Sequence, residues 1–277
     1  MIEQVVLAWA DPGNVSGRFM QSVMNLMYAS EQAFQRGDTP GYTVAGHLRV
    51  ESGPRIASAR NFLVRNFLID DKFRDVEWLL MLDADMTFDA SVLEHLFEGV
   101  RTAEGKIARP VVGGLCFAGG HGGIYPTMYR IVDPKTNGGD AISIVTDFEE
   151  DEVVEVDATG AACLLIHRGV LEYLAENYEE PCRWFAESVY LGQEFGEDWT
   201  FCVRIRQANV PIYVNTAAKT GHVKSVVMDE EMWRTGAVAL KPLAPAPAPK
   251  LEVVEGGLIL PSGPNREQRR AAARVRA

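Results

Sequence analysis

The chain has 277 residues, 47% of them hydrophobic, and a formal net charge of −11 at pH 7. This length and apolar content suit a folded domain with a sizeable core and exclude a largely disordered chain. The acidic balance argues against broad nucleic-acid binding, which depends on cation–phosphate attraction. No apolar stretch approaches the roughly 20 residues of a membrane-spanning helix. The opening MIEQVVLAWADP lacks the features of a signal peptide, so a cytoplasmic protein is expected.

Strand-like apolar segments alternate with helix-like amphipathic segments through the first half of the chain. Strands are expected at residues 4–9, 42–48, 78–82 and 110–117, and helices at 16–35, 56–69 and 90–102. This alternation predicts an α/β fold, in which a mostly parallel, mixed sheet is flanked by helices. In the helix at 56–69 the apolar residues share one face, and Arg60 and Asn61 fall outside that stripe. From residue 125 to 157 the pattern changes to short strands and turns.

Two carboxylates, Asp83 and Asp85, follow the apolar run at residues 78–82 in the motif DAD. Ligands of α/β sheets bind outside the carboxyl ends of the strands. Paired carboxylates suit Mg²⁺ or Mn²⁺, which also hold phosphate oxygens, so the motif indicates a phosphate-bearing substrate. DADMT also fits the nucleophile motif of haloacid-dehalogenase-like phosphatases. That class carries its motif on the opening strand, whereas two strand–helix units precede it here.

The segment GEDWTFCVRIRQANVPIYVNTAAKTGH, residues 196–222, resembles the GT-A glycosyltransferases, especially an inverting, family-2-like group that includes many phage-encoded enzymes. SARNFLVRNFL at 58–68, the DAD triplet and VDATGAACLLIHRGVLE at 156–172 belong to the same resemblance, which covers most of residues 1–224. It implies a GT-A, Rossmann-like catalytic domain that transfers a sugar from a nucleoside-diphosphate sugar. For a phage-encoded enzyme the compartment would be the host cytoplasm.

The resemblance also implies roles for individual residues. Asp85 would ligate the metal directly, Asp83 would serve the ribose or a metal-bound water, and His222 would complete the metal site. The cation would be Mn²⁺ or Mg²⁺. Inverting transfer needs a base for the acceptor hydroxyl, and Asp198 is expected to be that base. The neighbouring Glu197 is expected to orient the acceptor or to cap the helix.

The first half of the chain should hold the nucleotide-sugar, with a UDP-sugar favoured and a GDP-sugar possible. The loop ADPGNVSGRFM, which follows the first strand, is flexible enough to wrap a base and ribose. Gly160 would allow close approach of the backbone to the substrate, and Trp184 would offer a platform for a sugar ring or belong to the core. The expected contacts of the nucleotide-sugar are Ala10, Asp11, Ser16, Arg60, Asp83, Ala84, Asp85, Gly160 and Trp184.

The end of the chain differs in composition from the rest. Residues 1–240 are expected to form the catalytic domain, and KPLAPAPAPK at 241–250 a stiff linker. Residues 251–277 form an extension with a basic tail. A protein or a small glycan is expected as acceptor, and nucleic acid is less favoured. A retaining transferase of the same fold, a metal-dependent sugar nucleotidyltransferase and a phosphatase remain as alternatives.

Overall fold

The computed structural model describes residues 2–36, 41–120, 123–181 and 183–224. Within these residues the main sheet has eight strands. They are β1 (Glu3–Asp11), β2 (Tyr42–Glu51), β3 (Trp78–Asp83), β4 (Met86–Phe88), β5 (Val111–Leu115), β10 (Val153–Val156), β12 (Cys163–His167) and β15 (Ile212–His222). The linker expected at 241–250 and the extension expected at 251–277 lie outside the described residues.

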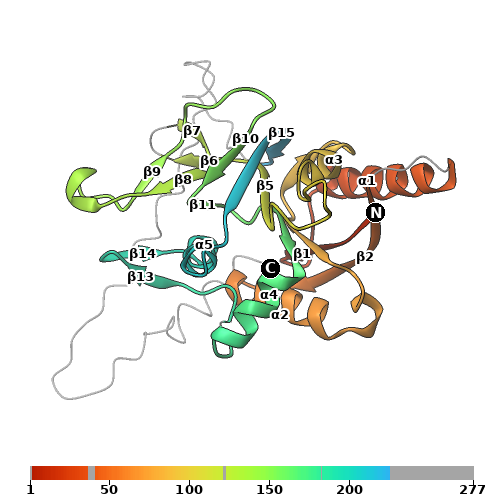
Figure 1. The fold of residues 1–277 in the computed structure, drawn as a ribbon, viewed down its shortest axis with the longest axis horizontal. Helices are drawn as coiled ribbons and strands as arrows, with labels where there is room; N and C mark the ends of the chain where they lie inside the picture. Colours follow the sequence, from red (N-terminus) through yellow and green to blue (C-terminus); the bar gives the residue numbers. More distant parts are fainter. Residues whose placement is uncertain (1, 37–40, 121–122, 182, 225–277) are drawn as a thin grey trace, which may run out of the picture. The chain divides into compact units, whose positions relative to one another are not determined.

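The main sheet is mixed, with the strand order β10-β15-β5-β12-β3-β1-β2, and β4 pairs with β15 outside this path. Figure 1 labels β10, β15, β5, β1 and β2 of this sheet. β1 runs parallel to both β2 and β3, and β5 runs parallel to β15. β12 is inserted antiparallel between β3 and β5, and β10 and β4 lie antiparallel on β15. The carboxyl ends of β1 and β3 therefore meet at one edge of the sheet.

Helices cover both faces of this sheet. The helices are α1 (Gly17–Arg36), α2 (Ile56–Ile69), α3 (Val92–Phe97), α4 (Arg168–Asn177) and α5 (Glu197–Gln207). Apolar residues of α2, α4 and α5 pack together with Leu79 and Met81 of β3, whereas those of α1 and α3 pack with Trp78, Leu80 and Leu82. Because β3 is buried on both faces, its sequence is a continuous apolar run. The α/β fold class predicted from the sequence is confirmed.

Smaller sheets lie between the main elements. β6 (Phe117–Gly120) pairs with β7 (Gly123–Pro126), and β8 (Met128–Ile131) pairs with both β9 (Ile142–Ile144) and β11 (Ala158–Thr159). β13 (Ser188–Tyr190) and β14 (Gln193–Phe195) form a hairpin directly before α5. Between residues 125 and 157, the short strands β8, β9 and β10 and the turns that separate them confirm the turn-rich pattern expected there.

The helix expected at 90–102 is shorter in the structure, where α3 ends at Phe97. Gly99 adopts a φ of +66°, a left-handed conformation that an α-helix cannot continue through. The Arg109 guanidinium lies against Gly99, where a Cβ atom would meet it at 2.4 Å, and donates to the Glu98 carbonyl. A long-range contact thus ends a helix that local periodicity would extend.

Two further features complete the description of the fold. None of the helices in the described ranges combines the length and apolar character needed to cross a bilayer. Cys116, Cys163 and Cys202 are buried free thiols, and Cys182 lies outside the described residues.

Candidate active site

A cleft of about 670 Å³ opens at the carboxyl ends of β1 and β3. This size falls within the range of ligand pockets in proteins, and the position is where α/β sheets bind ligands. Four separate segments of the chain contribute to its walls. The lining residues are Ala10, Pro12, Asn14, Val15, Ser16, Ile56, Arg60, Asp83, Ala84, Asp85, Glu197 and Asp198.

The loop after β1 is attached to the DAD segment. Ala10 lies beside Asp83 in the parallel pairing of β1 with β3. The Ser16 amide donates a hydrogen bond to the Ala84 carbonyl over 3.3 Å. Ala10, Ser16 and Ala84, all expected at the nucleotide site, therefore form one wall of the cleft.

Arg60 joins the acidic groups on the two sides of the cleft. Its side chain is only 6% exposed, and it pairs with Asp83 Oδ1 at 2.7 Å and with Glu197 Oε1. The guanidinium also lies over the Phe185 ring, 5.7 Å from its centroid. Arg60 was expected outside the apolar stripe of its helix, but it is buried because two carboxylates compensate its charge.

Asp85 and His222 form a second polar cluster in the same region. His222 Nε2 lies 3.0 Å from Asp85 Oδ2, and Lys224 Nζ lies 3.0 Å from the same oxygen. Burial opposes the ionised form of Asp85, but the bonds from His222 and Lys224 lower its pKa to about 2. The hydrogen bond to Asp85 raises the pKa of His222 against the effect of burial.

The metal site expected from Asp83, Asp85 and His222 is only partly assembled. Among the described residues, no three His, Cys, Asp or Glu side chains lie close enough together to hold a metal ion. Asp83 is bound by Arg60 and so is not grouped with the other two.

Asp85 and His222 nevertheless fit a divalent cation as two of its ligands. His222 Nδ1 lies 2.9 Å from the Phe117 carbonyl, and Nε2 faces the Asp85 carboxylate, so both ring nitrogens face acceptors. Two acceptors facing the ring favour its doubly protonated form, in the same direction as the raised pKa of His222. A cation can replace the proton on Nε2, while the carbonyl orients the ring from behind, as outer-shell partners of metal-bound histidines do.

Asp198 lies at the start of α5, where Trp199 N–H donates to its Oδ1 at 2.8 Å. Burial raises the pKa of this carboxyl group to about 6, although the charge of Arg60 acts in the opposite direction. A carboxylate that titrates near neutral pH is suited to proton transfer. Gly160 lies next to it, because a Cβ atom at Gly160 would be 3.6 Å from Asp198 Oδ2.

Two of the expected contact residues have side chains that point away from the cleft. The Asp11 carboxylate has no solvent exposure and binds Arg49 of β2 at 2.6 and 2.8 Å. Trp184 is 2% exposed, and its indole N–H donates to the Leu171 carbonyl at 2.8 Å. The platform expected from Trp184 is therefore wrong, since packing against α4 places this ring in the core, which was the alternative.

Sequence reasoning missed Lys224 and the Phe117 carbonyl as partners of the Asp85–His222 pair. Lys224 could have been predicted from the sequence, because a cation two residues from an expected metal ligand suits a phosphate site. The Phe117 carbonyl carries none, since a backbone acceptor has no side-chain identity. Thr127, which lies beside Gly160, was also missed.

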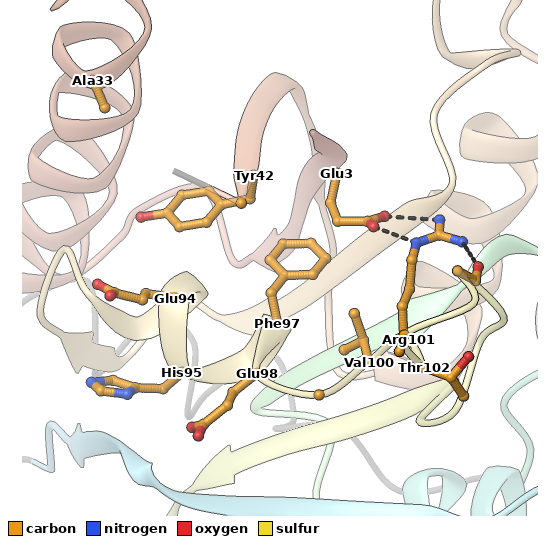
Figure 2. A pocket seen from close by; sticks show the side chains of 14 residues that line it. Glu3, Ala33, Tyr42, Glu94, His95, Phe97, Glu98, Val100, Arg101 and Thr102 are labelled. Carbon is orange, nitrogen blue, oxygen red and sulfur yellow. Dashed lines mark hydrogen bonds and ion pairs between the residues drawn. The ribbon is translucent and has the colours of Figure 1, made fainter. Parts of the chain in front are cut away.

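A second hollow, of about 960 Å³, lies at the amino-terminal ends of β1 and β2 beside α3 (Figure 2). Its Arg101 guanidinium faces Glu3 and pairs with both Glu3 and Glu77. The Trp78 indole N–H donates to Glu3 Oε2 at 2.8 Å, the oxygen that also accepts Arg101 Nη2. These contacts join β1, β3 and the segment after α3, so the cluster stabilises the sheet edge opposite the cleft.

Comparisons with known proteins find similarity in structure only. No protein-family model matches the chain, and no characterised protein matches its sequence. The crystal structure of A197 from STIV is 18% identical, with a TM-score of 0.45 over 80% of this chain and 86% of that one. GalNAc-T7, crystallised with UDP, GalNAc and Mn²⁺, is 13% identical, with a TM-score of 0.49 over 80% of this chain and 44% of that one.

A third similar structure is a glycosyltransferase involved in glycosylation of the major capsid of PBCV-1. It is 12% identical, with a TM-score of 0.30 over 62% of each chain. This chain thus spans less than two thirds of the second and third of these proteins. At these identities and scores the likeness is one of fold, and the activity of this chain has to be inferred from the residues of its cleft.

Proposed function

We propose that this protein is a metal-dependent glycosyltransferase. It would move a sugar from a nucleoside-diphosphate sugar, with UDP as the favoured nucleotide, to the hydroxyl of a protein or small-glycan acceptor. One observation carries the proposal. The cleft is lined by Asp83, by Asp85, whose carboxylate contacts His222 and suits a cation, and by Asp198, an acid with a near-neutral pKa.

The acids divide the work of an inverting displacement. Asp198 takes the proton of the acceptor hydroxyl as its oxygen bonds to the anomeric carbon. The bond from that carbon to the diphosphate oxygen breaks, and its electron pair leaves with the nucleoside diphosphate. Arg60 pairs with both Glu197 and Asp83 and so holds these two acids in place at the cleft.

Asp85 and His222 would hold Mn²⁺ or Mg²⁺, with Asp83 directed to the ribose or to a metal-bound water. The bound cation supplies stabilisation of the negative charge that develops on the departing diphosphate. Lys224 Nζ lies 3.0 Å from Asp85 Oδ2 and would add a second positive charge close to the diphosphate. Ala10, Ser16 and Ala84 line the part of the cleft proposed for the nucleoside.

The released product tests this proposal. With Mn²⁺ and a panel of UDP- and GDP-sugars, the protein should slowly release the nucleoside diphosphate even without an acceptor. Pyrophosphate release would identify a nucleotidyltransferase instead, and release of inorganic phosphate a phosphatase. Calorimetry should find UDP binding with Mn²⁺ in the unaltered protein and in Asp89→Ala, whose exposed acid lies outside the cleft, and its loss in Asp85→Ala.

A further inference from the structure

The two carboxylate oxygens of Asp198 have different surroundings. Oδ1 accepts the Trp199 amide at 2.8 Å and lies on the Gly196 side, 3.4 Å from where a Cβ atom of that glycine would be. Oδ2 faces Gly160 instead, and no hydrogen-bond donor to it is found among the described residues. Its lone pairs are therefore available, and it is the oxygen suited to receive a proton from a substrate.

The backbone conformation does not require a glycine at position 160, so we attribute this glycine to the space that it leaves free. It is absent from the glycines with positive φ among the described residues, so an L-amino acid could adopt its backbone angles. A Cβ atom there would make ordinary contacts, at 3.6 Å to Asp198 Oδ2 and 3.7 Å to Thr127 Cβ and Oγ1. A side chain would therefore fit the fold and would occupy the space directly in front of Oδ2.

The wall opposite Asp198 is fixed by hydrogen bonds. The Thr127 amide donates to the Cys116 carbonyl at 2.9 Å, and the Thr127 carbonyl accepts the Thr159 hydroxyl at 2.8 Å. Thr159 ends β11 immediately before Gly160. Thr127, which lies between β7 and β8, and Thr159, which ends β11, thus hold the backbone beside Gly160 in place.

Aromatic side chains lie near Asp198, and among the described residues Arg60 is the cation whose charge lowers the pKa of this acid. Tyr129 packs edge-on against Trp199 with ring centroids 5.0 Å apart. Burial and the nearby Tyr125 and Asp198 raise the pKa of Tyr129, so its phenol stays neutral. Asp198, Glu197 and Asp83 outnumber Arg60, which disfavours an anionic acceptor. Neutral, hydroxyl-rich molecules that pack on aromatic rings are typically carbohydrates.

We propose that Gly160 and Thr127 bound the port through which a carbohydrate hydroxyl reaches Oδ2 of Asp198, and that Gly160 determines which acceptors fit. This inference rests on the proposed transferase function and specifies its acceptor class. In the transfer step, Oδ2 takes the hydroxyl proton while the hydroxyl oxygen bonds to the anomeric carbon and the diphosphate leaves with the electron pair. Gly160 is a specificity-determining residue, because its lack of a side chain leaves room for the acceptor beside Oδ2.

The test separates acceptor binding from donor binding. Saturation-transfer NMR with a panel of p-nitrophenyl glycosides, in the presence of UDP and Mn²⁺, should detect binding to the unaltered protein. Gly160→Ala and Gly160→Ser should weaken that binding at least tenfold, in order of side-chain size, and leave the Kd for UDP within twofold. Gly53→Ala is the matched control, because a Cβ atom there meets nothing within 4 Å, whereas one at Gly160 would lie against Asp198 Oδ2.

Two results would overturn the inference. They are unchanged glycoside binding in Gly160→Ser, and binding of Ser- and Thr-containing peptides in place of every glycoside. The proposed function fails separately, through the donor. If UDP with Mn²⁺ does not bind but glycosides do so in a Gly160-dependent way, the port stands and the transferase reaction does not.

Discussion

At the scale of single residues, Arg60 is the centre of the charge arrangement in the cleft. Its guanidinium pairs with Asp83 and Glu197, and its charge also acts on Asp198. Removing one member of a buried ion pair typically costs about 3–5 kcal/mol, because the partner is left buried and uncompensated. The residue was expected to contact the nucleotide, and the structure gives it a second task, which is to hold three acids together.

Replacing Asp198 should remove the proton acceptor and leave the fold intact. A positioned base contributes about 10²–10⁴-fold, so Asp198→Asn should lower turnover at least about a hundredfold, whereas Glu194→Gln, an exposed acid on β14, should not. Because the base must be ionised, kcat/KM of the unaltered enzyme should fall as pH drops below about 6. Full turnover in Asp198→Asn, or an α-linked product from an α-linked donor, would refute the base and the inverting mechanism.

Replacing Arg60 should move the pH dependence as well as the rate. Burial raises the pKa of Asp198 and Arg60 opposes that rise, so Arg60→Met should raise the pKa further and shift the acid limb of kcat/KM to higher pH. Arg60→Lys keeps the charge and should shift the limb less. Arg65→Met serves as the control on the same helix, since Arg65 pairs with Glu180 at the surface. An unshifted limb in Arg60→Met would show that Arg60 does not act on Asp198.

At the scale of elements, Asn61 attaches α2 to the segment before β13. Its amide donates to the Ala57 and Phe185 carbonyls at 2.7 Å, and its oxygen accepts the Trp184 and Phe185 amides. The side chain is 2% exposed, so water cannot replace these partners. The position of Arg60, one residue earlier on α2, depends on this attachment.

Asn61→Ala should therefore lower the free energy of unfolding by about 2–4 kcal/mol, because several buried polar groups lose their partners. Asn66→Ala, one turn and a half further along α2, removes a single exposed bond to Phe62 and should change it by less than about 0.5 kcal/mol. Urea unfolding of both variants measures the difference. Equal stabilities would mean that the 184–185 segment finds other partners.

Sequence patterns predicted the elements best where burial is one-sided or complete. The helix expected at 56–69 is α2, Ile56–Ile69, and the apolar run at 78–82 is β3, since both patterns reflect contact with the core. The pattern failed at α3, where Gly99 and the distant Arg109 end the helix. Local periodicity contains no information about a partner that arrives ten residues later from another element.

The sequence predicted many of the residues that line the cleft, but not which of them form ion pairs or hydrogen bonds with one another. The spacing of Asp83 and Asp85 after an apolar strand indicated the edge of the sheet at which they lie. That Asp83 binds Arg60 while Asp85 binds His222 depends on tertiary packing. Likewise Asp11 is sequestered by Arg49 of the neighbouring strand, and Trp184 by α4, contacts that no single segment reveals.

At the scale of the whole molecule, the sheet brings together segments from both ends of the described chain. One cleft is lined by parts of β1 and the loop after it, of α2, of the DAD segment and of the start of α5, and β15 carries His222 to Asp85. β15 contacts β5, β10 and β4 on the way, so the His222 position is secured by three strand pairings. Every residue assigned to the proposed reaction lies within residues 10–224.

Removal of residues 241–277 should therefore leave the reaction intact. The alternating Pro and Ala of KPLAPAPAPK favour an extended linker, and the tail beyond it carries five arginines and one glutamate in its last 13 residues. A protein ending at Leu240 should keep its melting temperature within about 2 °C and its UDP release with Mn²⁺ within about twofold, since a surface change usually costs under about 0.5 kcal/mol. Thermal unfolding and product assays on both lengths measure this. A truncated protein that fails to fold would contradict the prediction and would indicate that LEVVEGGLIL packs on the catalytic domain as an added strand.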